Sequence, residues 1–186
     1  MEELEAYDAR TQFESFGYVV IRGLIPSAKA ALARAQSLAV LYAHGLIEDP
    51  NSDAPSKTFR ETLELLGGRR SIAAQLSRLQ VLNELMHLPY VLDIARQIGG
   101  ARYIPLPALA TRIGAPPNVL APEPAEIHQD YQGIQGSMRT LSCWVALGDY
   151  KPSDGGLAVA QGSHKLGCLP HEVDMAEHIR PVGAAA

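Results

Sequence analysis

The sequence predicts a single α+β domain in which a helix-rich part, residues 1–100, precedes a β-rich part, residues 101–186. Apolar residues recur at helical spacing as far as Gly99 and Gly100. Beyond these glycines, short runs of β-branched and aromatic residues alternate with clusters of Pro, Gly and Asp. No internal repeat or linker separates the two parts, and 186 residues with 47% hydrophobic content are enough to bury one sizeable core.

The N-terminal segment is predicted to form a helix, a strand and a second helix. Apolar residues from Glu2 to Phe16 follow an uneven helical spacing, and the run that continues to Ile21 is typical of a strand. Pro26 then precedes a stretch of strong helix formers that stops near Gly45. The stretch between Pro26 and Gly45 therefore predicts a helix.

The remaining elements are predicted from turn residues and apolar spacing. Residues 49–56 collect turn-forming residues, so we expect an exposed loop that either serves as a lid or, more commonly for surface loops, carries no chemistry. Apolar spacing over residues 70–98 is helical, and Pro89 divides it into two helices that end at Gly99 and Gly100. In the β-rich part we expect short strands over residues 103–104, 109–113, 140–147 and 157–160.

Charge and hydropathy restrict the partners. The formal net charge is −4 with both signs interspersed, so we expect a small-molecule substrate and neither a nucleic acid nor a membrane as partner. The acidic N-terminus lacks a secretory-signal pattern and no apolar run reaches membrane-spanning length, which predicts a cytoplasmic protein. Cys143 and Cys168 form no C-x-x-C pair, so we expect two buried, reduced thiols and no disulfide framework. The oligomeric state is not indicated.

The most informative local motif is the H-x-D formed by His128 and Asp130. In extended chain, residues i and i+2 point to the same side and can bind one metal ion together. Non-haem Fe(II) oxygenases use two His and one carboxylate on one face of the metal. A surface hydrogen-bonding pair is the commoner interpretation of an isolated H-x-D, so the segments around it have to decide between the two.

Five segments in order resemble the phytanoyl-CoA dioxygenase family. They are the opening Phe16 to Pro26, the H-x-D at His128 and Asp130, a tryptophan strand from Ser142 to Asp149, a glycine pair from Asp154 to Leu157, and a G-S-H-K turn from Gln161 to Gly167. The resemblance extends from about residue 13 to residue 182, although residues 50–100 match only in helical character.

This resemblance implies a double-stranded β-helix, a mainly β, jelly-roll or cupin-like core that is incomplete here and has the N-terminal helices packed on it. It also implies an oxygenase that depends on Fe(II), 2-oxoglutarate and O2, and that hydroxylates a small organic substrate with release of succinate and CO2. Halogenating relatives replace the carboxylate of the motif, so Asp130 favours hydroxylation.

By the same resemblance, His128 and Asp130 are metal ligands, and Trp144 and Thr111 contact the cosubstrate. The competing interpretation of Trp144 is a core residue, and for Thr111 a structural role is favoured. His164 corresponds to a turn residue and not to a ligand. We assign no function to the remaining helical histidines, His44 and His87.

The second histidine ligand of the family, and the arginine that binds the far carboxylate of 2-oxoglutarate, are not visible in the sequence. His171 and His178 precede no apolar strand and are disfavoured as ligands. We therefore expect the chain to be the N-terminal portion of such a domain, to bind Fe(II) weakly and to turn over little 2-oxoglutarate. Open sheet edges and an uncovered apolar face would make it marginally stable or self-associating.

Two alternatives stay open at this point. One is a non-catalytic binding protein that retains the fold but lacks the complete metal triad. The other is a metal-binding barrel of the cupin type with a different reaction. The glycine pair and the G-S-H-K turn favour the oxygenase over the cupin.

Overall fold

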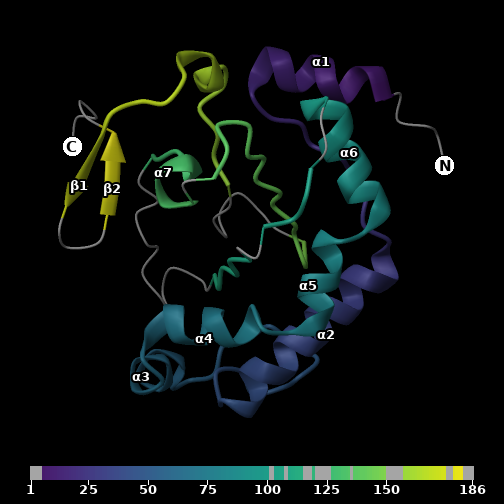
Figure 1. Cartoon of the computed structure of the whole chain (residues 1–186). Helices are drawn as coiled ribbons and strands as arrows, with labels where there is room; N and C mark the ends of the chain where they lie inside the picture. The colour runs from purple at the N-terminus through teal and green to yellow at the C-terminus, as the bar shows by residue number, and fades with distance from the viewer. Residues whose placement is uncertain are drawn as a thin grey trace.

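The computed structural model describes residues 6–100, 103–106, 109–114, 119, 127–134, 136–149, 157–174 and 178–181. Within these ranges the chain forms seven α-helices, a 3-10 helix and one two-stranded hairpin (Figure 1). In chain order the elements are α1 (Ala6–Phe16), α2 (Ser27–Ala43), α3 (Phe59–Leu65), α4 (Gly68–Leu76), α5 (Gln80–Met86), α6 (Pro89–Gly99), α7 (Asp130–Ile134), the 3-10 helix η2 (Ser163–Leu166), β1 (His171–Asp174) and β2 (His178–Pro181).

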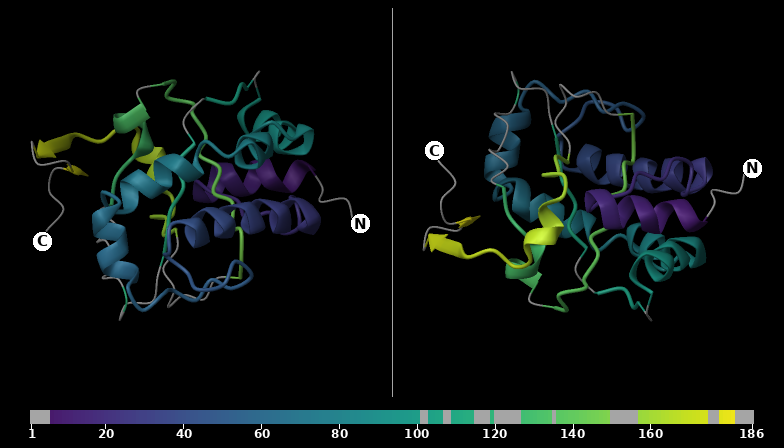
Figure 2. Two further views of the ribbon diagram at one scale, coloured as in Figure 1. Left: turned by 90° about the horizontal axis from the view of Figure 1, so that it is seen from below. Right: turned by 90° about the horizontal axis from the view of Figure 1, so that it is seen from above.

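The first two predicted helices are confirmed as α1 and α2. Pro26 lies at the N-terminal cap of α2, where its carbonyl accepts the N–H of Ala30 at 3.1 Å. The chain leaves α2 through Gly45, whose φ of +71° is a conformation that other residues rarely adopt. Figure 2 shows α1 alongside α6, against which it packs.

Three helices, α4, α5 and α6, occupy the stretch where the sequence predicts two. α6 begins with Pro89 and ends at Gly99, with Gly100 at φ +64° as its C-terminal cap, as predicted. The additional break lies between α4 and α5. There the side-chain amide of Asn83 donates to the carbonyls of Ser77 and Leu79, both at 3.0 Å. The bond to Ser77 satisfies a carbonyl at the C-cap of α4, and the bond to Leu79 adds to the backbone N–H groups of Leu82 and Asn83 that this carbonyl already accepts.

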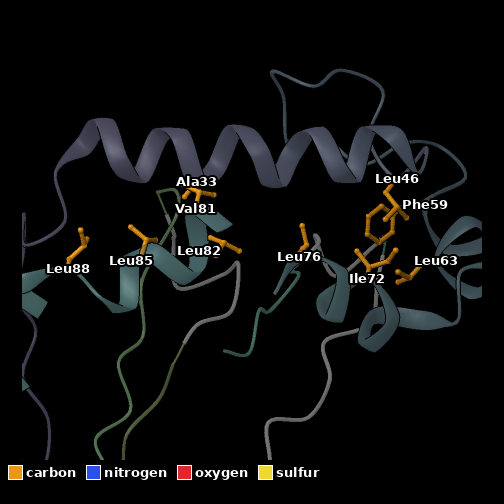
Figure 3. Packing of buried hydrophobic residues seen from close by; sticks show 10 residues of the cluster. All are labelled: Ala33, Leu46, Phe59, Leu63, Ile72, Leu76, Val81, Leu82, Leu85 and Leu88. Carbon is orange, nitrogen blue, oxygen red and sulfur yellow. The ribbon is translucent and has the colours of Figure 1, made fainter. Parts of the chain in front are cut away.

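The core lies between α2 and the short helices α3, α4 and α5 (Figure 3). Leu46 and Ile72 are its largest fully buried side chains. α3 was not predicted, because its seven residues place only Phe59 and Leu63 in the core, too few to produce a clear period. The other buried members of this cluster are Ala33, Leu76, Val81, Leu82, Leu85 and Leu88.

The second half of the chain packs on this helical layer with alternating burial. In residues 109–114 every second residue, beginning with Leu109, is half-buried, and the residues between them are exposed. Val145 and Leu147 are likewise half-buried and pack on the core, whereas Trp144 is exposed. The helices therefore provide the surface that positions the segments around the H-x-D.

The expected double-stranded β-helix, with a mainly β, jelly-roll or cupin-like core, is wrong. The described residues are predominantly helical, and their strand ladder is limited to the antiparallel hairpin of β1 and β2. The segments predicted as strands, 103–104, 109–113, 140–147 and 157–160, pair with no other strand in the described parts of the chain. In residues 109–113 and 145–147 the period-two pattern reflects alternating burial against helices, whereas residues 157–160 are all exposed. A strand also requires a hydrogen-bonded neighbour.

The strand predicted through Ile21 is also wrong. The N–H of Gly17 bonds the carbonyl of Phe13 at 2.8 Å, and Gly17 has a φ of +84°. This turn closes α1, and residues 18–21 after it pair with no strand in the described part of the chain.

The loop over residues 49–56 is mostly exposed, as predicted, and several contacts hold it. Ser56 N–H bonds the carbonyl of Leu46 at 2.9 Å, and Asp53 forms an ion pair with Arg34 of α2 at 2.8 Å. Cys143 and Cys168 are both exposed, so the expectation of buried thiols is wrong. Across the described residues, no helix combines the length and apolar character needed to span a membrane.

Candidate functional site

The H-x-D pair lies where the chain enters α7. His128 Nε2 is 3.3 Å from Asp130 Oδ1, and the two side chains are 47% and 50% exposed. Asp130 is the first residue of α7, so the extended chain that the sequence predicts through this motif ends there. The two candidate ligand atoms, His128 Nε2 and Asp130 Oδ1, nevertheless lie close together at a position that solvent can reach.

A serine from a distant segment orients the carboxylate. Ser142 Oγ donates a hydrogen bond to Asp130 Oδ2, the oxygen that does not face His128. Ser142 belongs to the segment whose Val145 packs on the core, so the hydroxyl is attached to the rigid part of the molecule. Sequence reasoning missed Ser142, because a single serine in an apolar run carries no signal of its own.

The residue between the two candidate ligands is bonded elsewhere. Gln129 Nε2 donates to the carbonyl of Gly167 at 2.8 Å, and its Oε1 accepts the N–H of Leu169 at 2.9 Å. These bonds join the H-x-D to the chain that follows η2. Sequence reasoning gave Gln129 no role, and its only signal is its place inside the motif.

The two predicted cosubstrate residues lie in different surroundings. Trp144 is 47% exposed, so its interpretation as a core residue is wrong, and its contact with 2-oxoglutarate stays a prediction. Thr111 is half-buried, and its hydroxyl donates to the carbonyl of Ala73 at 2.7 Å and lies 3.3 Å from Ser77 Oγ. These bonds attach the segment of Thr111 to α4, and a cosubstrate contact of Thr111 also stays a prediction.

Three further histidines make contacts away from the pair. His164 Nε2 lies 3.1 Å from a backbone carbonyl oxygen of α1. His44 bonds the side chain of Gln75 at 2.8 Å, and His87 bonds the carbonyl of Asn83 at 2.9 Å. The contacts of His164 and His44 join parts of the fold that are distant in the sequence, whereas that of His87 is local to the C-terminal end of α5.

The separation of the two donor atoms fits two corners of a metal coordination shell. Two ligand atoms that each lie about 2.1 Å from an ion, at right angles, are about 3 Å apart. The 3.3 Å between His128 and Asp130 is close to that value, and their atoms are of the types found in a 2-His-1-carboxylate triad. Among the residues that the structure describes, no third His, Cys, Asp or Glu joins them.

The hairpin carries the two histidines that the sequence disfavours as ligands. His171 lies opposite Pro181, and His178 lies opposite Asp174, at the other end of the ladder. At the usual rise of a strand, the two backbone positions are about 10 Å apart along the hairpin. The hairpin therefore does not bring the two histidines together, and the expected absence of a third ligand stays a prediction.

Comparison with known proteins gives one informative result. The family model described as phytanoyl-CoA dioxygenase (PhyH) matches residues 13–183. No curated protein and no solved structure gives a significant match. The matched range contains the His128–Asp130 pair, Ser142, the turn around η2 and both strands.

Proposed function

The chain belongs to the phytanoyl-CoA dioxygenase family, a family of dioxygenase enzymes, and from this membership we propose that its His128–Asp130 pair serves an Fe(II)- and 2-oxoglutarate-dependent oxygenase. The observation that carries the proposal is the approach of His128 Nε2 to Asp130 Oδ1 at 3.3 Å, inside the range that the family matches. Solvent exposure of both side chains leaves room for a metal ion and its other ligands.

The proposed reaction consumes 2-oxoglutarate, O2 and a substrate C–H group. One oxygen atom forms the new substrate hydroxyl, and the other enters the carboxylate of succinate as CO2 is lost. Fe(II) held by His128 and Asp130 would supply open coordination positions for 2-oxoglutarate and O2. The presence of Asp130, a carboxylate where halogenating relatives lack one, favours hydroxylation.

The side chains of this chain then have distinct tasks. His128 offers its Nε2 lone pair and Asp130 its Oδ1, while Ser142 donates to Oδ2 and keeps that carboxylate in one orientation. Trp144 exposes an indole ring, which combines an apolar face with one N–H donor that suits a carboxylate such as that of 2-oxoglutarate. The substrate is a small organic molecule, since no basic cluster recommends a CoA ester.

The test is succinate formation with Fe(II) in large excess over protein, so that a weak site is filled. We expect slow succinate release that depends on both Fe(II) and O2, at a rate far below a typical kcat of about 10 per second. His128→Ala and Asp130→Ala should lower it to that of a protein-free blank. His87→Ala removes an exposed histidine of α5's C-terminal end and should match the wild type.

Equal succinate release by wild type and His128→Ala would show that the pair does not carry the reaction. Binding of 2-oxoglutarate that is independent of metal, with no succinate formed, would instead favour the non-catalytic binding protein. Failure to bind 2-oxoglutarate at all would favour a different metal-dependent reaction.

A further inference from the structure

The side chain of Gln129 forms a two-point bond with the turn that follows η2. Its amide donates to the carbonyl of Gly167 at 2.8 Å and accepts the N–H of Leu169 at 2.9 Å. A primary amide is a side-chain group that donates and accepts in one plane, as a peptide group does. Gln129 is half-buried by this contact, whereas His128 and Asp130 on either side are exposed.

This bond fixes the direction in which the two neighbours point. Where the chain is extended, a side chain points to the opposite face from the residues before and after it. With Gln129 held against residues 167–169, its two neighbours in the chain bring His128 Nε2 and Asp130 Oδ1 to 3.3 Å from each other, where Asp130 begins α7. Releasing Gln129 would free the backbone that sets this separation.

The helix η2, which leads into residues 167–169, is attached to α1 together with its N-cap Gly162. The N–H of Gly162 bonds the carbonyl of Phe16 at 2.9 Å, and His164 Nε2 donates to the carbonyl of Glu14 at 3.1 Å. The His164 ring also lies against Phe13, with ring centroids 6.1 Å apart. Figure 1 shows this yellow-green turn beside α1. The H-x-D is thus connected through Gln129 and the turn to the helical scaffold.

We propose that Gln129 is a positioning residue, which holds His128 and Asp130 at metal-binding separation by clamping the H-x-D to residues 167–169. The proposal rests on the proposed function, because positioning matters only if the pair binds metal. Outer-shell partners of metal ligands typically contribute about tenfold to a hundredfold in affinity. Gln129 bonds neither ligand side chain directly, and it would orient both ligands through the backbone that it shares with them.

The experiment measures Mn(II) affinity by the relaxation of water protons, with Mn(II) as a stand-in for Fe(II) that air does not oxidise. We expect Gln129→Ala to weaken Mn(II) binding about tenfold or more. Gln129→Met keeps most of the side-chain volume but forms neither hydrogen bond. It should weaken Mn(II) binding as much as Gln129→Ala does. Gln80→Ala is the matched control, because Gln80 bonds Glu84 on the exposed face of α5.

A second readout needs no metal. Amide hydrogen exchange of Leu169 should speed up in Gln129→Ala and Gln129→Met, and stay unchanged in Gln80→Ala. Unchanged exchange of Leu169 would overturn the clamp, and faster exchange with wild-type Mn(II) affinity would overturn the positioning role. Restored affinity in Gln129→Met would assign the effect to packing and overturn the role of the hydrogen bonds.

The two proposals fail in different ways. If the wild type binds no Mn(II) at His128, the proposed function fails and the positioning role with it, while Leu169 exchange still tests the clamp. If the wild type binds Mn(II) there and Gln129→Ala binds it equally well, the proposed function stands and only the positioning role is overturned.

Discussion

The hydroxyl group of Ser142, and not a charged side chain, donates a hydrogen bond to Oδ2 of the Asp130 carboxylate. We predict that Ser142→Ala weakens Mn(II) binding about tenfold, because a hydrogen-bonded outer-shell group orients the ligand. The free energy of unfolding should change by less than about 1 kcal/mol, since Ser142 is exposed. Titration with Mn(II) and urea unfolding measure the two quantities.

Ser137→Ala is the control for this change. Its hydroxyl accepts the N–H of Arg139 at 3.1 Å, a local bond between residues two apart in the chain. If both serine variants keep wild-type Mn(II) affinity, the hydroxyl of Ser142 has no orienting role.

At this scale the sequence predicted the pair but not its partners. His128 and Asp130 are two residues apart, so a local rule of chain geometry can predict that their side chains lie on one side of the chain. Ser142 is 12 residues from Asp130, and the partners of Gln129 are 38 and 40 residues away. Such contacts depend on how the whole chain folds, and no spacing rule within the sequence reports them.

At the scale of elements, the C-terminal end of α1 contacts η2 at Gly17, which lies against the ring of His164. A Cβ atom at Gly17 would lie 2.5 Å from His164 Nδ1, and Gly17 has a φ of +84°. We predict that Gly17→Ala destabilises the protein by about 1–2 kcal/mol through its backbone conformation and by a further 1–3 kcal/mol through the steric overlap. Thermal or urea unfolding measures the sum.

Two comparisons separate the contributions. Gly23→Ala, at φ +71° with nothing within 4 Å, should show the backbone cost alone. Adding His164→Ala to Gly17→Ala should recover part of the steric cost, as a double-mutant cycle would detect. Equal destabilisation by Gly17→Ala and Gly23→Ala would show that His164 does not pack against α1.

The loop over residues 49–56 is tied to α2 by the ion pair of Arg34 and Asp53. The guanidinium of Arg34 also lies close to Gly148, where an added Cβ atom would be 2.6 Å from Arg34 Nη1. The hydrogen bond from Arg34 lowers the pKa of Asp53 below its ordinary value of 3.8. The stabilisation is therefore present above pH 3.8 and lost as the pH falls through the folded pKa. Because Asp53 is 72% exposed, screening limits it to about 0.2–1 kcal/mol.

Asp53→Asn tests this linkage by urea unfolding at several pH values. The variant should be less stable than the wild type at neutral pH, and the difference should shrink as the pH falls below 3.8. A difference that grows toward acid pH would contradict the sign of the pKa shift.

For the whole molecule, the helical half was largely predictable and the β-rich half was not. α1, α2 and α6 follow from local signals such as Pro26, Pro89 and Gly100, which act within a turn of the chain. The double-stranded β-helix required strands to pair across long separations, and period-two burial does not specify a partner. The described chain satisfies that pattern by packing extended apolar positions on helices instead.

The central claim, that His128 and Asp130 bind a divalent metal, is tested most directly by mapping Mn(II) on the intact chain by NMR. Paramagnetic broadening falls off steeply with distance, so a bound ion marks its neighbours. We predict that substoichiometric Mn(II) first broadens the amide signals of residues 127–131 and of Ser142, and that His128→Ala abolishes this effect. Broadening that begins elsewhere, or that survives in His128→Ala, would contradict the account.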